Sequence, residues 1–156
     1  MRTGLKRSCS EIFNHYSPQG RKEREERPGM KKDENMLSKE ILGAAIEVHS
    51  CLGAGLMESA YEECLCRELS IRGLIFERQK PLAVSYKGVR LDCGYRLDIV
   101  VGGLVILELK AVGQIEPIHE AQLLTYLKLS GLKLGILINF NVPLLKDGIK
   151  RIVHGL

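Results

Sequence analysis

Two apolar segments joined by a pair of glycines constrain the fold of this chain more than any other feature. Residues 89–101 and 104–112 are rich in β-branched and aliphatic side chains, and glycines occupy positions 102–103 between them. This pattern predicts two antiparallel strands of a hairpin. Residues 76–86 have the same character and precede a turn at 87–88. We therefore expect three consecutive antiparallel strands.

Helical periodicity flanks these strands. Residues 38–51, with Ser38 as the expected N-cap, and residues 57–72 carry apolar side chains at a spacing of three or four, which predicts two amphipathic helices. Pro117 can occupy the first position of a third helix, which we expect to end by Gly131.

The remaining apolar run, residues 135–140, is typical of a strand covered on both faces. Residues 144–152 are weakly helical at best. The expected order is therefore α-α-β-β-β-α-β with room for a last helix, and the fold class is α/β, with helices flanking a sheet.

Composition changes near residue 36. Residues 1–35 hold nine Lys or Arg and six Asp or Glu, but few apolar residues, so they cannot bury enough surface to order themselves. We predict a disordered charged tail over residues 1–35, a non-essential extension of a working domain at 36–156, and an unchanged melting temperature for a chain that starts at Met36. The other reading, a nucleic-acid-seeking arm of net charge +3, is disfavoured by the mixed charges.

Length and composition exclude several classes of protein. The chain has 156 residues and a net charge of +4, which fits one compact domain plus a tail. Its longest apolar stretch, 132–140, is far shorter than the roughly 20 residues of a membrane-spanning helix. No apolar segment follows the first basic residues, so we expect a cytoplasmic protein without a membrane partner. The oligomeric state stays open, with a homodimer among the options.

Three charged residues interrupt the apolar hairpin. Glu108 and Lys110 are two apart, so both should leave one face of their strand while Leu107 and Leu109 leave the other. Asp98 interrupts the preceding strand. Two carboxylates at this point suit Mg²⁺, or Mn²⁺, and a neighbouring ammonium could orient or deprotonate a water molecule or balance charge on a phosphoryl group. A lone Glu-x-Lys would be read as a structural ion pair, but the added Asp98 favours function.

The proposed site also sets a condition on the hairpin loop. If residues 102–103 formed a two-residue turn, Asp98 would pair with Leu107, and Glu108 would lie on the opposite face. We therefore predict a three-residue loop or a bulge between Asp98 and Glu108.

Two helices could add polar groups to this site. In the third, His119, Gln122 and Tyr126 form one polar stripe, although His119 taken alone is more typical of a surface histidine. In the second, Glu58 lies on the stripe of Tyr61, where an acid in the first turn could equally serve the helix dipole.

A basic patch on the first two strands could contact a phosphate backbone, with only Asp92 opposing it. Protection of an edge strand by charge explains the patch equally well. Its members are Arg78, Lys80, Lys87, Arg90 and Arg96.

Several motifs together resemble a known family. The run Gly55-Leu56-Met57-Glu58-Ser59-Ala60-Tyr61 matches the signature of the GxxExxY proteins, and the resemblance extends through Asp98, Glu108-Leu109-Lys110 and the Gln122-x-x-x-Tyr126 pattern. It covers about residues 36–156. This family is placed in the RecB-like branch of the PD-(D/E)XK nuclease superfamily, so the resemblance implies a restriction-endonuclease-like α-β-β-β-α-β core with a mixed sheet.

The resemblance also implies roles for these residues. Asp98, Glu108 and Lys110 would form the catalytic core, with Asp98 and Glu108 as metal ligands and with Gln122, Tyr126 and Glu58 in support. We expect a Mg²⁺- or Mn²⁺-dependent deoxyribonuclease that hydrolyses phosphodiester bonds of DNA in preference to RNA. The competing reading is a non-catalytic module on a nuclease fold that binds nucleic acid or protein.

Overall fold

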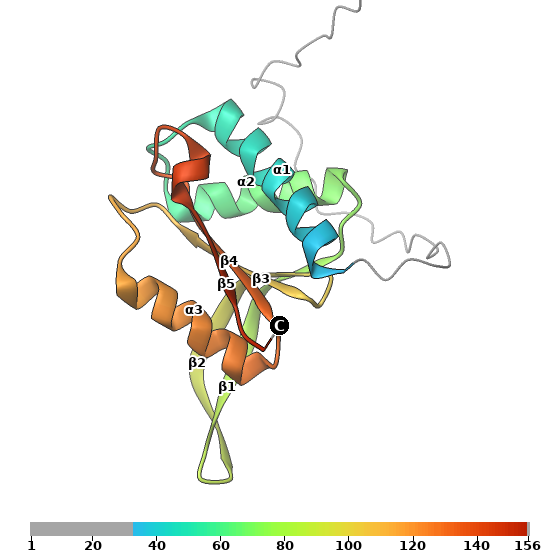
Figure 1. Ribbon diagram of the computed structural model, residues 1–156, viewed down its shortest axis with the longest axis vertical. Coiled ribbons are helices and arrows are strands. Elements are labelled where there is room, and N and C mark those ends of the chain that lie inside the picture. The colour runs from blue at the N-terminus through green and yellow to red at the C-terminus, as the bar shows by residue number, and fades with distance from the viewer. Residues whose placement is uncertain (1–32, 156) are drawn as a thin grey trace, which may run out of the picture. The chain divides into compact units, whose positions relative to one another are not determined.

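The computed structural model describes residues 33–155, in which helices flank a five-stranded sheet (Figure 1). The helices are α1 (Glu34–Leu52), α2 (Glu58–Ile71) and α3 (Pro117–Ser130). The strands are β1 (Phe76–Tyr86), β2 (Val89–Val101), β3 (Val105–Lys110), β4 (Leu134–Asn139) and β5 (Ile149–Val153), and the 3₁₀ helix η2 (Leu145–Gly148) precedes the last of them. Residues 1–32 of the expected tail lie outside the described residues.

The sheet is mixed, with its strands in the order β1-β2-β3-β4-β5. Only β3 and β4 run parallel, and α3 supplies the crossover that parallel neighbours require. The expected α/β fold is thus confirmed, with the three antiparallel strands at one end of the sheet.

Two apolar clusters cover the two faces of this sheet. On one face, Ile41 of α1 and Leu65 of α2 share a cluster with Leu107 of β3. On the other, Leu123 of α3 packs in a cluster with Ile106. Figure 1 shows the same arrangement, with α1 and α2 together on one side and α3 on the other. In residues 33–155, no helix has both the length and the apolar character needed to cross a membrane.

The first helix begins earlier than its sequence pattern suggested. Asp33 is the N-cap, and its carboxylate accepts a hydrogen bond from the Met36 N–H at 2.8 Å. The expected cap, Ser38, is buried inside α1. The earlier start lets Leu37, which is 2% exposed, pack one turn before Ile41. The predicted boundary between tail and domain stays untested, but a cut at Met36 would remove this cap.

The carboxyl-terminal segment forms β5, where the sequence suggested a weak helix at best. Strand β5 pairs antiparallel with β4 from Ile138↔Ile149 to Leu134↔Val153. The open edge of β4 supplies the backbone partners that this short segment lacks on its own, so a tertiary contact overrides its weak local preference.

Strands β1 and β2 extend past the rest of the sheet as a two-stranded hairpin (Figure 1). We call residues 83–96 the hairpin arm. Its tip is a two-residue turn in which Lys87 and Gly88 have φ of +48° and +78°, the conformation that such tight hairpins favour. Every residue from 85 to 96 is exposed, which leaves the outer arm free for contact.

The capping contact predicts a measurable loss of stability. Asp33→Ala should lower the free energy of unfolding by about 1 kcal/mol, because it removes the acceptor for the first helical N–H groups. Thermal unfolding followed by circular dichroism would measure this loss. Asp33→Asn is the matched control and should stay near wild type, since asparagine caps equally well; equal losses in both variants would contradict the capping role.

Candidate active site

The loop between β2 and β3 sets which residues face each other. The register runs Val101↔Val105, Val100↔Ile106 and Ile99↔Leu107, so the loop holds three residues, 102–104, as predicted. Gly102 and Gly103 both have positive φ, at +61° and +66°, which side chains disfavour. One step further along the register, Asp98 lies opposite Glu108.

At Asp98, one residue before the paired segment of β2, the backbones of β2 and β3 no longer pair. Hydrogen bonds from side chains to backbone groups link the two strands there instead. The Asp98 carboxylate accepts the Leu109 N–H at 2.8 Å. In return, the Asp98 N–H makes a longer contact of 3.4 Å with Oε1 of Glu108. Both carboxylates therefore lie together in the opening between β2 and β3.

The pleat of β3 directs its charged side chains to one face. Leu107 and Leu109 belong to the apolar cluster under α1 and α2, whereas Ile106 belongs to the cluster under α3. Because strand side chains alternate, Glu108 and Lys110 leave the sheet on the side of Ile106. The predicted split between charged and apolar faces of β3 is confirmed.

Strand β4 supports the end of β3 from the other side. The Phe140 N–H donates to the Lys110 carbonyl at 2.9 Å. Asn139, which is 1% exposed, accepts the Val112 N–H at 3.1 Å and donates to the Val112 carbonyl at 2.9 Å. These bonds fix the backbone at Lys110 and two residues beyond it, so the Lys110 side chain starts from a defined position.

The loop before α2 brings Glu58 to the same region. Gly55 has a φ of +101°, and the Tyr61 hydroxyl braces the loop by donating to the Gly53 carbonyl at 2.6 Å and accepting the Leu56 N–H at 3.2 Å. Glu58 follows in the first turn of α2. Tyr61 is therefore a structural part of its motif.

The charge environment of Glu58 shows which groups lie near it. Burial raises the pKa of Glu58 most, the Lys110 ammonium lowers it, and the Asp98 carboxylate raises it further. The structure thus brings a third carboxylate, from α2, into the electrostatic range of the two on the strands.

Helix α3 presents Gln122 and Tyr126 to the site. The Gln122 amide donates to the Tyr126 hydroxyl at 2.6 Å. Burial raises the pKa of Tyr126, and the Glu108 carboxylate adds to that rise, so the phenol lies near the strand carboxylates. His119 has a capping role instead, because its Nδ1 accepts the N–H of the N-cap residue Glu116 at 3.0 Å.

Burial and like charge disfavour two ionised carboxylates at this point. Burial, followed by the Asp98 charge, raises the pKa of Glu108 to about 8. Burial also raises the pKa of Asp98, although the Leu109 N–H opposes the rise. Lys110 lowers both pKa values without restoring either to its ordinary range. Asp98 and Glu108 therefore have too little positive charge near them for both carboxylates to ionise at their ordinary pKa values.

A divalent cation fits this deficit. Asp98 and Glu108 offer hard oxygen donors in contact with each other, the donor type that Mg²⁺ and Mn²⁺ prefer. Within residues 33–155, no three His, Cys, Asp or Glu side chains are grouped closely enough to hold a metal ion. The fit is therefore to a cation that takes two protein carboxylates and fills its other positions with water and phosphate oxygens.

The structure divides the five basic residues into two groups. Arg78 pairs with Glu62 and Glu63 at 3.0 and 2.7 Å, and Lys80 pairs with Glu77 at 2.8 Å. Arg78 and Lys80 are therefore engaged within the protein.

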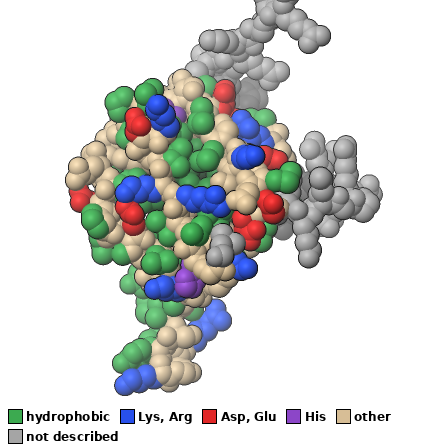
Figure 2. Space-filling model, viewed as in Figure 1, with side chains coloured by type: hydrophobic (Ala, Val, Ile, Leu, Met, Phe, Trp, Pro, Cys, Tyr) green, Lys and Arg blue, Asp and Glu red, His purple; other side chains and the backbone are tan. Residues whose placement is uncertain are grey.

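The other three basic residues are Lys87, Arg90 and Arg96, which are exposed on the hairpin arm. Arg96 also donates to the Gln79 carbonyl at 3.2 Å. In Figure 2 cationic and hydrophobic side chains share the projecting arm. These three side chains remain accessible to an external partner.

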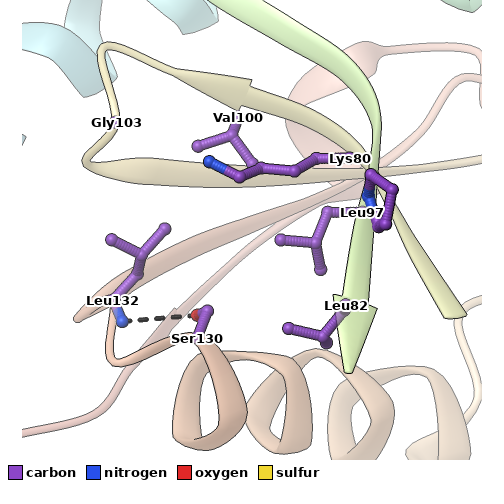
Figure 3. Close-up of a pocket in the computed structure, with 8 residues that line it drawn as sticks. Lys80, Leu82, Leu97, Val100, Gly103, Ser130 and Leu132 are labelled. Atoms are coloured by element: carbon purple, nitrogen blue, oxygen red, sulfur yellow. Dashed lines mark hydrogen bonds between the residues drawn. The ribbon is translucent and has the colours of Figure 1, made fainter. Parts of the chain in front are cut away.

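A small pocket of about 170 Å³ lies on the α3 side of the sheet, between β1, β2 and the end of α3. It is lined by Lys80, Pro81, Leu82, Leu97, Val100, Gly103, Ser130 and Leu132 (Figure 3). Its lining is mainly apolar and includes no carboxylate. Neither Asp98 nor Glu108 lines this pocket, so the candidate active site lies outside it.

Two residues near the site were not predicted from the sequence. Glu62 is buried one turn after Glu58, and Gln79, next to the paired Lys80, has a φ of +47°. The spacing of Glu58 and Glu62 was a usable signal, because residues four apart share a helix face. Nothing in the sequence indicated the unusual backbone of Gln79.

Comparison with known proteins agrees with this geometry. Residues 35–152 match the family described as the PD-(D/E)XK nuclease superfamily. No match was found among curated proteins or solved structures. Because the matched region covers most of the chain, the protein belongs to the PD-(D/E)XK nuclease superfamily, whose members generally hydrolyse phosphodiester bonds and typically use divalent metals.

The raised pKa of Glu108 predicts a pH-dependent stability. Between pH 4.5 and about 8 the folded, metal-free protein binds more protons at Glu108 than the unfolded chain does, so its stability should fall as pH rises through this range. Glu108→Gln removes the titration. In chelator, the melting temperature of this variant should be close to wild type at pH 5 and exceed it by several degrees at pH 8.5.

Glu47→Gln, on an exposed position of α1, is the control and should show no such divergence. A difference between Glu108→Gln and wild type that stays constant from pH 5 to pH 8.5 would contradict the raised pKa.

Proposed function

We propose that this protein is a Mg²⁺- or Mn²⁺-dependent nuclease that hydrolyses phosphodiester bonds of DNA in preference to RNA. One observation carries the proposal: Asp98 and Glu108 meet where β2 and β3 separate, and Lys110 lies close enough to lower the pKa of both. Among the residues described, this site combines a buried carboxylate, Glu108, with a partly buried one, Asp98, and the charge of the Lys110 ammonium acts on both. Such a cluster costs stability unless a cation occupies it.

Each residue of the site has a proposed role. Asp98 and Glu108 hold the cation, which supplies charge stabilisation to the phosphate oxygens when bound. The Lys110 ammonium orients the attacking water and offsets negative charge that develops on the phosphorus oxygens. The water oxygen forms a new bond to phosphorus as the P–O bond to the leaving nucleotide breaks, and the proton that water loses ends, through solvent, on the leaving oxygen as a hydroxyl group.

Three supporting side chains surround this core. Gln122 and Tyr126, held to each other by their hydrogen bond, would donate to a substrate phosphate or to water. Glu58 would hold water on the side of α2. The match of Glu58 to the GxxExxY signature, and of Gln122 and Tyr126 to the RecB-like pattern, supports these roles.

The hairpin arm supports a preference for duplex DNA. Lys87, Arg90 and Arg96 are exposed on a two-stranded ribbon, a shape that the major groove of B-DNA admits. The major groove of A-form RNA is deep and narrow, and side chains cannot read it. We propose that these three cations contact phosphates, whereas the ion pairs of Arg78 and Lys80 give those two residues a structural role.

The second candidate function is a non-catalytic binding module on the nuclease fold. The exposed apolar side chains of the arm, Tyr86, Val89 and Leu91, favour it, because they could contact a partner protein or a second copy of this chain. A cytoplasmic location remains a prediction of the sequence under either function, and the oligomeric state stays open. The two functions differ in whether a divalent cation binds and whether DNA is cut.

Metal binding and cleavage separate these functions. In chelator, Asp98→Asn should be at least as stable as wild type, because it removes a like charge. Saturating Mn²⁺ should raise the melting temperature of wild type by several degrees, and Asp98→Asn should lose most of that rise. Lys110→Ala should keep the rise but lose cleavage of linear and circular DNA. If Mn²⁺ shifts no melting temperature and no nucleic acid is cut, the binding module becomes the better reading.

The arm makes a separate prediction about affinity. The double variant Lys87→Ala/Arg90→Ala should bind duplex DNA more weakly, and its plot of log K against log salt should be less steep by about 2. Fluorescence anisotropy at several salt concentrations would measure both. Lys39→Ala/Arg67→Ala, which removes exposed cations from α1 and α2, is the matched control. An equal change in both double variants would show that the arm has no special contact with DNA.

A further inference from the structure

A buried carboxylate outside the proposed metal site ties α2 to β1. Glu62, which is 8% exposed, uses both of its oxygens. Oε1 accepts from Nε of Arg78 at 3.1 Å, and Oε2 accepts from the side-chain amide of Gln79 at 2.9 Å. Because both oxygens already have donors, Glu62 is poorly suited to be a metal ligand.

The residue that Glu62 holds has an unusual backbone. Gln79 has a φ of +47°, in the left-handed region that residues other than glycine rarely adopt. Such a conformation persists where surrounding contacts impose it. Two hydrogen bonds hold Gln79 in this conformation. Its side-chain amide donates to Glu62, and its backbone carbonyl accepts from Arg96 at 3.2 Å.

This backbone feature lies directly beside the candidate active site. The pairing of β1 with β2 runs through Arg78↔Ile99 and Lys80↔Leu97 and omits the step between them. That step would pair Gln79 with Asp98. The positive φ of Gln79 therefore occurs opposite Asp98, whose carboxylate accepts the Leu109 N–H of β3.

Resting on the proposed function, we infer that Glu62 is a positioning residue, which acts through Arg78 and Gln79 to fix Asp98 of β2 relative to Glu58 of α2. Glu58 and Glu62 lie one helical turn apart on α2. The contacts of Glu62 thus link the helix that carries one site carboxylate to the strand beside the other. Its expected effect is on the geometry of the cation and water, without direct contact with the substrate.

Substitutions at Glu62 test this role against a direct electrostatic one. Glu62→Met keeps the bulk of the side chain but removes both acceptors. We expect its kcat for DNA cleavage to fall roughly 10-fold or more and its Kd for Mn²⁺, measured by calorimetry, to rise by a similar factor, with KM for DNA unchanged. In Glu62→Gln the new side-chain oxygen can still accept from Arg78. Its NH₂ group can donate to the side-chain oxygen of Gln79 once the Gln79 amide has turned over. This variant should stay within about 3-fold of wild type in both readouts, as expected when hydrogen bonding rather than charge matters.

The neighbouring residue supplies a matched control. Glu63 also pairs with Arg78, at 2.7 Å, but is exposed on α2. Glu63→Met should keep the wild-type kcat and Mn²⁺ affinity. A Glu62→Gln variant as impaired as Glu62→Met would overturn the inference, because charge would then be the property that matters.

Gln79 gives a second test that does not depend on α2. Gln79→Gly should keep kcat closer to wild type than Gln79→Val does, because glycine adopts positive φ freely and a β-branched residue does not. Equal kcat in these two variants, or a wild-type kcat in Glu62→Met, would overturn the positioning role alone. A wild-type protein that neither binds Mn²⁺ nor cuts DNA would overturn the proposed function and this inference with it.

Discussion

The hydrogen bond from the Leu109 N–H to the Asp98 carboxylate is the contact on which the candidate site depends. At this point β2 and β3 no longer pair through their backbones, and a buried N–H without an acceptor would cost free energy. The side chain of Asp98 satisfies that donor and is thereby fixed next to Glu108. One bond therefore lets the sheet open and places a carboxylate in the opening. A hydrophobic residue at position 98 would fit the apolar strand better but would leave the N–H unpaired.

Several features of the candidate site are locally destabilising. The buried Glu108 and the partly buried Asp98 lie near each other with raised pKa values, and Lys110 offsets their repulsion only in part. Gln79, across from Asp98, has a backbone conformation that its side chain disfavours. Such local conflicts cluster at functional sites, where the surrounding structure imposes them. The two apolar clusters on either side of the sheet supply the rigidity that makes these conflicts tolerable.

The Gly55-x-x-Glu58-x-x-Tyr61 motif combines three physical roles in seven residues. Gly55 permits a positive φ in the loop before α2, and the Tyr61 hydroxyl holds that loop while its ring stacks on Phe140 at 4.5 Å. Glu58 is then the residue of the motif whose side chain is left for chemistry. Two of the three motif positions thus serve to place the third, which explains why the spacing matters as much as the residue types.

The sequence by itself determined the element order through β4 and most of the candidate site. The period-two pattern of β3 put Glu108 and Lys110 on one face, and the requirement that Asp98 join them predicted the three-residue loop, because side-chain alternation is a local property of a strand. Only the tertiary structure decided the rest. Strand β5 forms because β4 offers a free edge, and α1 starts at Glu34 because Asp33 can cap it and Leu37 can reach the core. Arg78 is engaged in ion pairs with Glu62 and Glu63 from another element. The contact between Glu62 and Gln79 joins residues from different elements, and no local pattern encodes such a pairing.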